Sequence, residues 1–409
     1  MNANGRNRQD LLEAYAAMFS RSGLENMQHE GRAVVEAARE GACVFDSEGR
    51  RFIDGDSAAG IFNLGRRNAI LVEELKCAVR ETDQGNFPMI SVEKARLAQA
   101  LSAFVGGELD CSIFSVMRGE TVEFACKLAR GFTGRRELVT FDGAYLGETG
   151  FAMSLSADAQ KEKYGPLVPD VRVLPFGDIK AARAGVSAKS AAVIIEPVQA
   201  ENHCRCASDS YLIELKKICR DRGVLLVLDE TQSGFGRCGD RFAFLRSGVE
   251  PDMLIVGEAL GGGLFPIAAT VITQRVNEFL NAHPMIHLST FGGSDIGCRV
   301  AKKALEIYSE LEPWHNARRI GDRLRNGIET VIAEQPQSIK SLAGVGLLLS
   351  LQLADEEAAC AFCRRASQNG LLLSRGRIRR DTVMLRPPLT LTDAEADEIL
   401  HIIGESAGG

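Results

Sequence analysis

Residues 118–121 of this 409-residue chain have the types and spacing of a phosphate site. Gly119, Glu120 and Thr121 open a segment whose helical pattern continues to Arg130. The free N–H groups at the start of a helix suit a phosphate, and Arg118 could add a charge-assisted contact. An ordinary helix start would have a similar sequence, so the motif alone leaves both interpretations open.

Two further positions could carry chemistry. Asp229 closes the apolar run Val224–Leu228, where a carboxylate is costly to bury without a cation or a hydrogen-bond donor. Glu258 follows the apolar run Met253–Val256 and precedes Gly261–Gly263, which permit close backbone approach. A capping or salt-bridging role for Asp229 and a plain glycine turn remain equally open at this stage.

The elements that must position these residues are short apolar runs separated by helical patterns. Ala192–Ile195, Val224–Leu228 and Met253–Val256 are typical of buried parallel strands. Repeated strand–helix–strand units predict an α/β fold with a mainly parallel sheet flanked by helices. Ligands bind at the carboxyl ends of such strands, where Asp229 and Glu258 both fall.

The change in the pattern of helices and strands along the chain predicts a large and a small domain. We expect residues 1–69 to supply a helical arm, a polar loop and part of the small domain, with a hairpin over Cys43–Ile53. Residues 70–305 form the large α/β domain, and residues 306–409 complete a smaller α+β domain.

Composition excludes several classes of protein. A net charge of −6, from 48 basic and 54 acidic side chains, disfavours a nucleic-acid partner. No apolar run is long enough to span a membrane, and the first residues do not resemble a secretory signal. The 11 scattered cysteines predict a reducing, cytoplasmic location without disulfides. We expect no metal, although His203, Cys204 and Cys206 form a cluster whose role is left open.

Several longer motifs together resemble one family. Asp229–Arg237, Gly248–Asp252 and Ala259–Gly263 with Pro266 and Ile267 are similar to the class III pyridoxal-phosphate aminotransferases. The likeness extends through Glu120–Arg130, Phe141–Tyr145, Glu196–Pro197, Ser289–Gly293 and Pro387–Thr390. The resemblance implies a fold type I transferase and pyridoxal or pyridoxamine phosphate as cofactor.

The resemblance also implies roles at matching positions. Asp229 would pair with the pyridine nitrogen, Gln232 would lie near the 3-hydroxyl, and Tyr145 would stack on the ring. The phosphate turn would comprise Arg118, Gly119 and Glu120. Thr290 would reach the phosphate across the interface of a homodimer.

The departures from the family pattern concern the chemistry itself. The family has a lysine, which forms the Schiff base with the cofactor, where this chain has Glu258, and a carboxylate cannot form an imine. The hydroxyls of the phosphate turn are lost at Met117 and Gly119, and the usual substrate-carboxylate arginine is Met384. Arg386 lies two residues further along, on the same face of a strand. Glu196 and Arg386 are the candidate substrate-binding residues.

Two functional hypotheses follow. In the first, the chain is an enzyme that binds pyridoxal or pyridoxamine phosphate without a covalent tether and acts on an amine or amino-acid-like substrate. Glu258 then replaces the lysine as general base or acid in a proton shift, an elimination or a half-transamination. In the second, the chain is a catalytically inactive binding or scaffold subunit.

Overall fold

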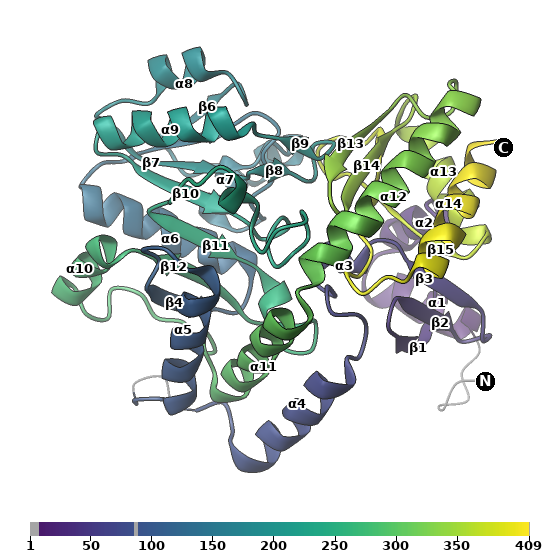
Figure 1. Ribbon diagram of the computed structural model, residues 1–409, viewed down its shortest axis with the longest axis horizontal. Coiled ribbons are helices and arrows are strands. Elements are labelled where there is room, and N and C mark those ends of the chain that lie inside the picture. Colours follow the sequence, from purple (N-terminus) through teal and green to yellow (C-terminus); the bar gives the residue numbers. More distant parts are fainter. Residues whose placement is uncertain (1–7, 86–88, 409) are drawn as a thin grey trace.

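The computed structural model describes residues 8–85 and 89–408, and it has a larger and a smaller lobe (Figure 1). The described termini both lie in the smaller lobe, so the chain starts there, builds the larger lobe and returns (Figure 1). No helix among the described residues is long and apolar enough to cross a membrane.

A seven-stranded sheet forms the centre of the larger lobe. Its strands, in spatial order, are β4 (Cys111–Ser115), β12 (Ala268–Ile272), β11 (Met253–Val256), β10 (Leu225–Asp229), β7 (Ser190–Ile195), β5 (Glu137–Phe141) and β6 (Val171–Leu174). Only β12 runs antiparallel to its neighbours. The predicted mainly parallel α/β sheet is therefore confirmed.

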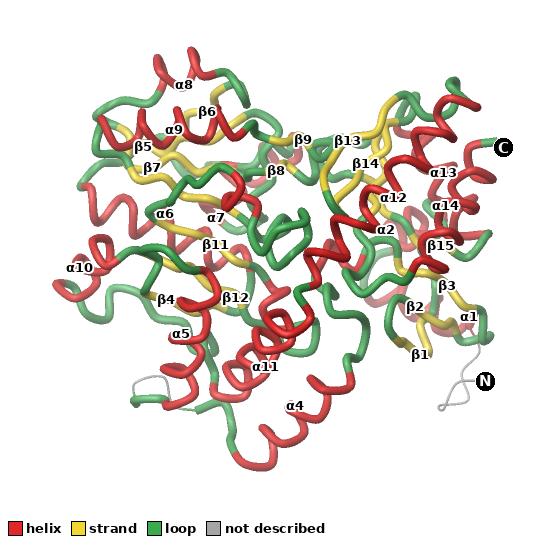
Figure 2. Tube along the Cα trace, viewed as in Figure 1, coloured by secondary structure: helices red, strands yellow, loops and turns green. Residues whose placement is uncertain are grey.

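Helices cover both faces of this sheet, and Figure 2 shows its strands lying between them. One face packs against α4 (Ala69–Glu81), α5 (Val92–Val105), α8 (Ile179–Gly185), α9 (Asp209–Asp221) and α11 (Asp295–Leu311). The other packs against α6 (Arg118–Thr133), α7 (Gly150–Leu155) and α10 (Gln274–Ala282). Along β10, Leu226 and Leu228 enter the first core and Leu225 and Val227 enter the second, as the alternation of side chains on a strand requires.

Short elements connect these helices and strands. They are the 3₁₀ helices η1 (Ala159–Tyr164), η2 (Ala243–Arg246) and η3 (Glu258–Gly261), and the two-stranded ribbon of β8 (Val198–Gln199) and β9 (Arg205–Cys206).

The smaller lobe is built from both ends of the chain. Its N-terminal elements are α1 (Arg8–Met18), α2 (Arg21–His29), β1 (Glu36–Glu40), β2 (Cys43–Asp46), β3 (Arg51–Asp54) and α3 (Ser57–Gly60). Its C-terminal elements are α12 (Pro313–Glu334), β13 (Ser341–Val345), β14 (Leu348–Gln352), α13 (Glu356–Gln368), β15 (Leu371–Leu372), β16 (Ser374–Arg375), β17 (Thr382–Leu385) and α14 (Asp393–Ala407).

A separate hydrophobic cluster joins Ala42 and Ile53 to apolar residues between Ala317 and Ala407. The domain boundaries near residues 69 and 305 stay a proposal, and the core of the larger lobe extends past the second of them to Tyr308 and Trp314. The predicted hairpin is present as β2 paired with β3.

The polar loop expected before residue 40 is wrong in part, because Glu36–Glu40 forms strand β1. This strand pairs antiparallel with β2 and all five of its side chains are exposed. Its sequence has no alternation of apolar and polar residues, so only the backbone ladder reveals it.

Candidate functional site

A cavity of about 520 Å³ lies where the carboxyl edge of the large sheet meets the smaller lobe. Four of the residues singled out in the sequence are placed at this edge by strands or by the turns that follow them. Asp229 ends β10, Glu196 follows β7, Glu258 follows β11, and Arg118 begins α6 just after β4. Arg118 and Glu258 line the cavity together with Tyr145.

The buried centre of the site is an arginine held between two carboxylates. The Arg118 guanidinium donates to Asp229 Oδ2 from Nε at 3.1 Å and from Nη2 at 2.9 Å. Nη2 also donates to Glu196 Oε1 at 3.1 Å. All three side chains are buried, so the arginine supplies the cation that a carboxylate at the end of an apolar strand requires.

The charges in this centre shift one another's protonation. Burial acts to lower the pKa of Arg118, but the adjacent Asp229 and Glu196 outweigh it and raise that pKa above its usual value. Burial raises the pKa of Glu196, and the like charge of Asp229 adds to this although Arg118 opposes it. One guanidinium thus faces two carboxyl groups, and Glu196 holds a proton more readily than an ordinary glutamate does.

Tyr145 covers the guanidinium from the cavity side. The Arg118 Cζ atom lies 5.4 Å from the centre of the Tyr145 ring. The backbone N–H of Tyr145 donates to Glu196 Oε2 at 2.9 Å, which fixes the loop over the buried centre. The ring and Asp229 therefore enclose a flat cationic group, which is stabilised by its contact with the aromatic face.

Glu258 occupies the N-terminus of α6. Its Oε1 accepts a hydrogen bond from the backbone N–H of Arg118 at 2.9 Å, so a carboxylate lies where the sequence predicted a phosphate. Among the described residues Glu258 forms no ion pair, and its side chain is only partly buried beside the cavity. Gly119 is required here, because a Cβ atom would lie 2.8 Å from the Thr149 methyl group.

A second charged group closes the side of the cavity toward the smaller lobe. Arg386 donates from Nε to Asp56 Oδ1 at 2.7 Å and from Nη1 to Glu201 Oε1 and Gln232 Oε1, each at 2.6 Å. Gln232 in turn donates to Glu201 at 3.1 Å. Arg386 is thus already paired with two carboxylates, and Gln232 belongs to this group rather than to the Asp229 centre.

Four predicted residues do not line the cavity: Asp229 and Glu196 are buried against Arg118, and Glu120 and Thr290 lie apart from this centre. Thr290 is exposed and does not line the cavity, and Glu120 points back to accept a hydrogen bond from the Val116 N–H at 2.8 Å. Their expected contact with a phosphate stays a prediction.

Sequence reasoning missed several residues that line the cavity. These are Arg32, Asp56, Glu148, Glu201, Arg375 and Arg377. Glu201 lies five residues after Glu196, and Asp56 lies two residues after the end of β3, but nothing in the sequence indicates that both contact Arg386.

The sequence left open the role of the cluster formed by His203, Cys204 and Cys206. His203 bonds to Ser350 and Ser341 through its two ring nitrogens, at 3.0 and 3.1 Å. Cys204 is buried and Cys206 is exposed, and all the cysteines are free thiols. These contacts use both nitrogens of His203, so they give no support to a metal at this cluster.

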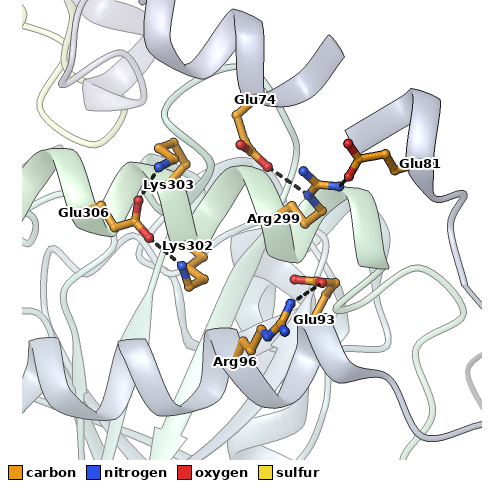
Figure 3. Close-up of a pocket in the computed structure, with 8 residues that line it drawn as sticks. All are labelled: Glu74, Glu81, Glu93, Arg96, Arg299, Lys302, Lys303 and Glu306. Carbon is orange, nitrogen blue, oxygen red and sulfur yellow. Dashed lines mark hydrogen bonds and ion pairs between the residues drawn. The ribbon is translucent and has the colours of Figure 1, made fainter. Parts of the chain in front are cut away.

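A separate charged cleft of about 410 Å³ lies between α4, α5 and α11 (Figure 3). Arg299 pairs there with Glu74 and Glu81, Arg96 pairs with Glu93, and Lys302 and Lys303 both pair with Glu306. Every charged side chain drawn in Figure 3 has a partner of opposite charge, so the cleft is a network of ion pairs. It contains none of the residues predicted to carry chemistry.

Comparison with known proteins agrees with the fold and the motifs. The family model "Aminotransferase class-III" matches residues 26–406. An uncharacterized aminotransferase of Archaeoglobus fulgidus is 32% identical over 394 residues, which cover 96% of this chain and 93% of the relative.

Solved structures show the same architecture. An ornithine aminotransferase from Toxoplasma gondii, with partial occupancy of PLP at its active site, superposes with a TM-score of 0.86 at 25% identity, covering 91% of this chain and 90% of that one. An acetylornithine aminotransferase from Elizabethkingia anophelis gives a TM-score of 0.85 at 24% identity, covering 98% and 99%. Because the family model matches residues 26–406, which are nearly the whole chain, this chain belongs to the class III aminotransferase family.

Proposed function

We propose that this chain is an enzyme that binds pyridoxal phosphate or pyridoxamine phosphate without a covalent tether and acts on an amine. The observation that carries the proposal is the enclosure of a cation between Asp229 and the Tyr145 ring, at the edge of a cavity. A protonated pyridine ring is also flat and cationic, so it suits the same two partners.

Whether the site fits such a cofactor can be judged from two charged side chains that already occupy it, Arg118 and Glu258. The guanidinium of Arg118 stands where a pyridinium would pair with Asp229, and the carboxylate of Glu258 stands where a phosphate would meet the α6 N–H. These stand-ins have the same signs as the two ends of the cofactor. The donor set therefore fits the group once Arg118 and Glu258 move aside.

The residues that would hold the cofactor follow from this arrangement. Asp229 would keep the ring nitrogen protonated, Tyr145 would cover the ring, and the first N–H groups of α6 would receive the phosphate. Arg118 would turn to the phosphate from its place at the first residue of α6. When bound, the cofactor supplies the carbonyl or amine that condenses with the substrate and a ring that accepts its electrons.

Glu258 is the group of this chain proposed to move a proton. Among the described residues, only the Arg118 N–H reaches its carboxylate, through Oε1, so Oε2 is left to accept a proton from a molecule in the cavity. A carboxylate that is partly buried can serve as general base or acid, although it cannot take over the covalent role of a lysine.

The charged group around Arg386 supports an amine rather than a dicarboxylate as substrate. Arg386 is buried and already paired with Asp56 and Glu201. A substrate carboxylate would have to displace one of these partners, which costs the desolvation of a buried charge. An ammonium group, in contrast, finds the Glu258 carboxylate on the cavity wall, which forms no ion pair among the described residues.

We also propose a homodimer in which Thr290 of each subunit lies near the partner's site. Exposed apolar side chains flank Thr290 in the sequence: Met285, Ile286, Leu288 and Phe291. Such a group favours burial against another protein surface. Light scattering coupled to gel filtration measures the mass, and a monomer at micromolar concentration would contradict the proposal.

A titration tests the proposed function. Purified protein is mixed with pyridoxal phosphate or pyridoxamine phosphate, and the visible absorbance and heat of binding are followed, first alone and then with candidate amines. We expect saturable binding that Asp229→Ala abolishes and Glu148→Gln leaves unchanged. If neither form binds and no amine changes the spectrum, the alternative of a catalytically inactive binding or scaffold subunit replaces the enzyme proposal.

A further inference from the structure

Arg118 makes two contacts of opposite polarity at one place in the chain. Its guanidinium neutralises Asp229 and its own backbone N–H binds Glu258. The proposed function assigns Asp229 to the ring nitrogen of the cofactor and the N-terminus of α6 to its phosphate. In the cofactor-free chain both partners are therefore already occupied by the chain's own charged groups.

We infer that Arg118 and Glu258 compete with the cofactor for Asp229 and for the N-terminus of α6, so that the cofactor binds and leaves as an exchangeable co-substrate. This inference rests on the proposed function, since it describes how the same site is occupied and vacated. The chain then has a stable cofactor-free state, in contrast to a protein that depends on a resident group to neutralise its buried carboxylate.

The two side chains differ in how tightly they are held. Arg118 is buried and gives three hydrogen bonds to Asp229 and Glu196, whereas Glu258 is partly exposed and accepts one. Glu258 therefore leaves first, when an anion approaches α6. Arg118 follows once a second cation is available to Asp229, because a buried carboxylate without a cation is costly.

The exchange would give Asp229 and the N-terminus of α6 one new partner each. Before it, the Arg118 guanidinium pairs with Asp229 and the Glu258 carboxylate with the α6 N–H. After it, Asp229 would pair with the ring nitrogen, the α6 N–H groups and Arg118 would hold the phosphate, and Glu258 would be released toward the cavity. Glu196 would lose its contact with Arg118 and keep the hydrogen bond from the Tyr145 N–H, so this buried carboxyl group would take up a proton.

The test removes the negative charge of Glu258, which lies at the N-terminus of α6. Glu258→Gln keeps the shape of the side chain but ends its repulsion of an anion. We expect this variant to bind inorganic phosphate and pyridoxamine phosphate at least about tenfold more tightly than the natural chain, a change that corresponds to about 1.4 kcal/mol. Pyridoxamine without phosphate should gain little. Calorimetric titration measures all three ligands.

A matched control is Glu148→Gln, which neutralises a carboxylate of the same cavity that does not contact α6. Equal affinity of Glu258→Gln and the natural chain for inorganic phosphate and for pyridoxamine phosphate would overturn the inference while leaving the proposed function intact. A gain for inorganic phosphate, with no binding of pyridoxamine phosphate by either protein, would support the competition at α6 and contradict the cofactor-dependent function.

Discussion

Replacing Arg118 by methionine tests the buried centre directly, because the change keeps an unbranched apolar stem and removes only the cation. Three hydrogen bonds to Asp229 and Glu196 are lost, and two buried carboxyl groups remain. Breaking a buried ion pair by removing one partner typically costs about 3–5 kcal/mol of unfolding free energy. We expect a loss of that size at pH 8.

The loss should shrink as the pH falls. Without the guanidinium, which opposes the effect of burial, the folded-state pKa of Glu196 rises further above its unfolded value. A group with a raised folded pKa contributes stability that is present below its unfolded pKa and disappears as the pH rises through the folded pKa. The Arg118→Met variant should therefore approach the natural chain in stability at pH 5 and fall below it at pH 8.

Urea unfolding followed by the fluorescence of Trp314 measures the effect, because this side chain belongs to the core of the larger lobe. The control is Arg323→Met, whose partner Asp397 is exposed, and which should leave the urea midpoint nearly unchanged. The reasoning is refuted if Arg118→Met and the natural chain unfold at the same urea concentration at pH 8. Adding Asp229→Asn to Arg118→Met should restore part of the loss, since it removes one uncompensated charge.

Three further predictions follow from single residues. Glu258→Lys should give a visible absorbance band with pyridoxal phosphate that survives gel filtration, and no band would contradict an otherwise intact site. Asp381→Asn should cost about 1–2 kcal/mol of unfolding free energy at pH 7, because Arg379 lowers the pKa of Asp381 to about 2. That contribution is present above pH 4 and is lost as the pH falls through 2, so urea midpoints that differ equally at pH 7 and pH 2 would argue against it. Arg237→Leu should cost roughly 3 kcal/mol in thermal unfolding, because the buried guanidinium bonds to two carbonyls of the smaller lobe and to Asn63; an unchanged melting temperature would contradict this.

The centre of the large sheet could be predicted because its strands β7, β10 and β11 are buried on both sides. Each run, such as Leu225–Asp229, is buried along its whole length, so the sequence has a continuous apolar signal bounded by a polar residue. The exposed strand Glu36–Glu40 has no such signal and depends on backbone pairing with a neighbour. Burial, rather than strand formation itself, is what the sequence made visible.

The partners within the site could not be predicted in the same way. Arg118 and Asp229 are 111 positions apart, and Arg386 and Asp56 are 330 apart. Adjacency to Gly119 suggested that Arg118 faces a phosphate, but its side chain lies on the strand-end carboxylate instead. Which of two nearby anions an arginine pairs with depends on how deeply each anion is buried, and burial is a property of the folded chain.

The free energy needed to bury these charged groups bears on whether the site has a function. A buried ion pair contributes little net stability, and apolar residues of similar volume are often equally stable or better. Stability of the fold alone therefore gives no reason to bury Asp229, Arg118 and Glu196 instead of a packed apolar group. Their arrangement nevertheless places a cation beside Asp229 and an anion, Glu258, at α6, in the order that a zwitterionic ligand would require. A scaffold would need only the fold, whereas a site that exchanges a charged ligand needs these partners, and this difference favours the enzyme over the inactive subunit.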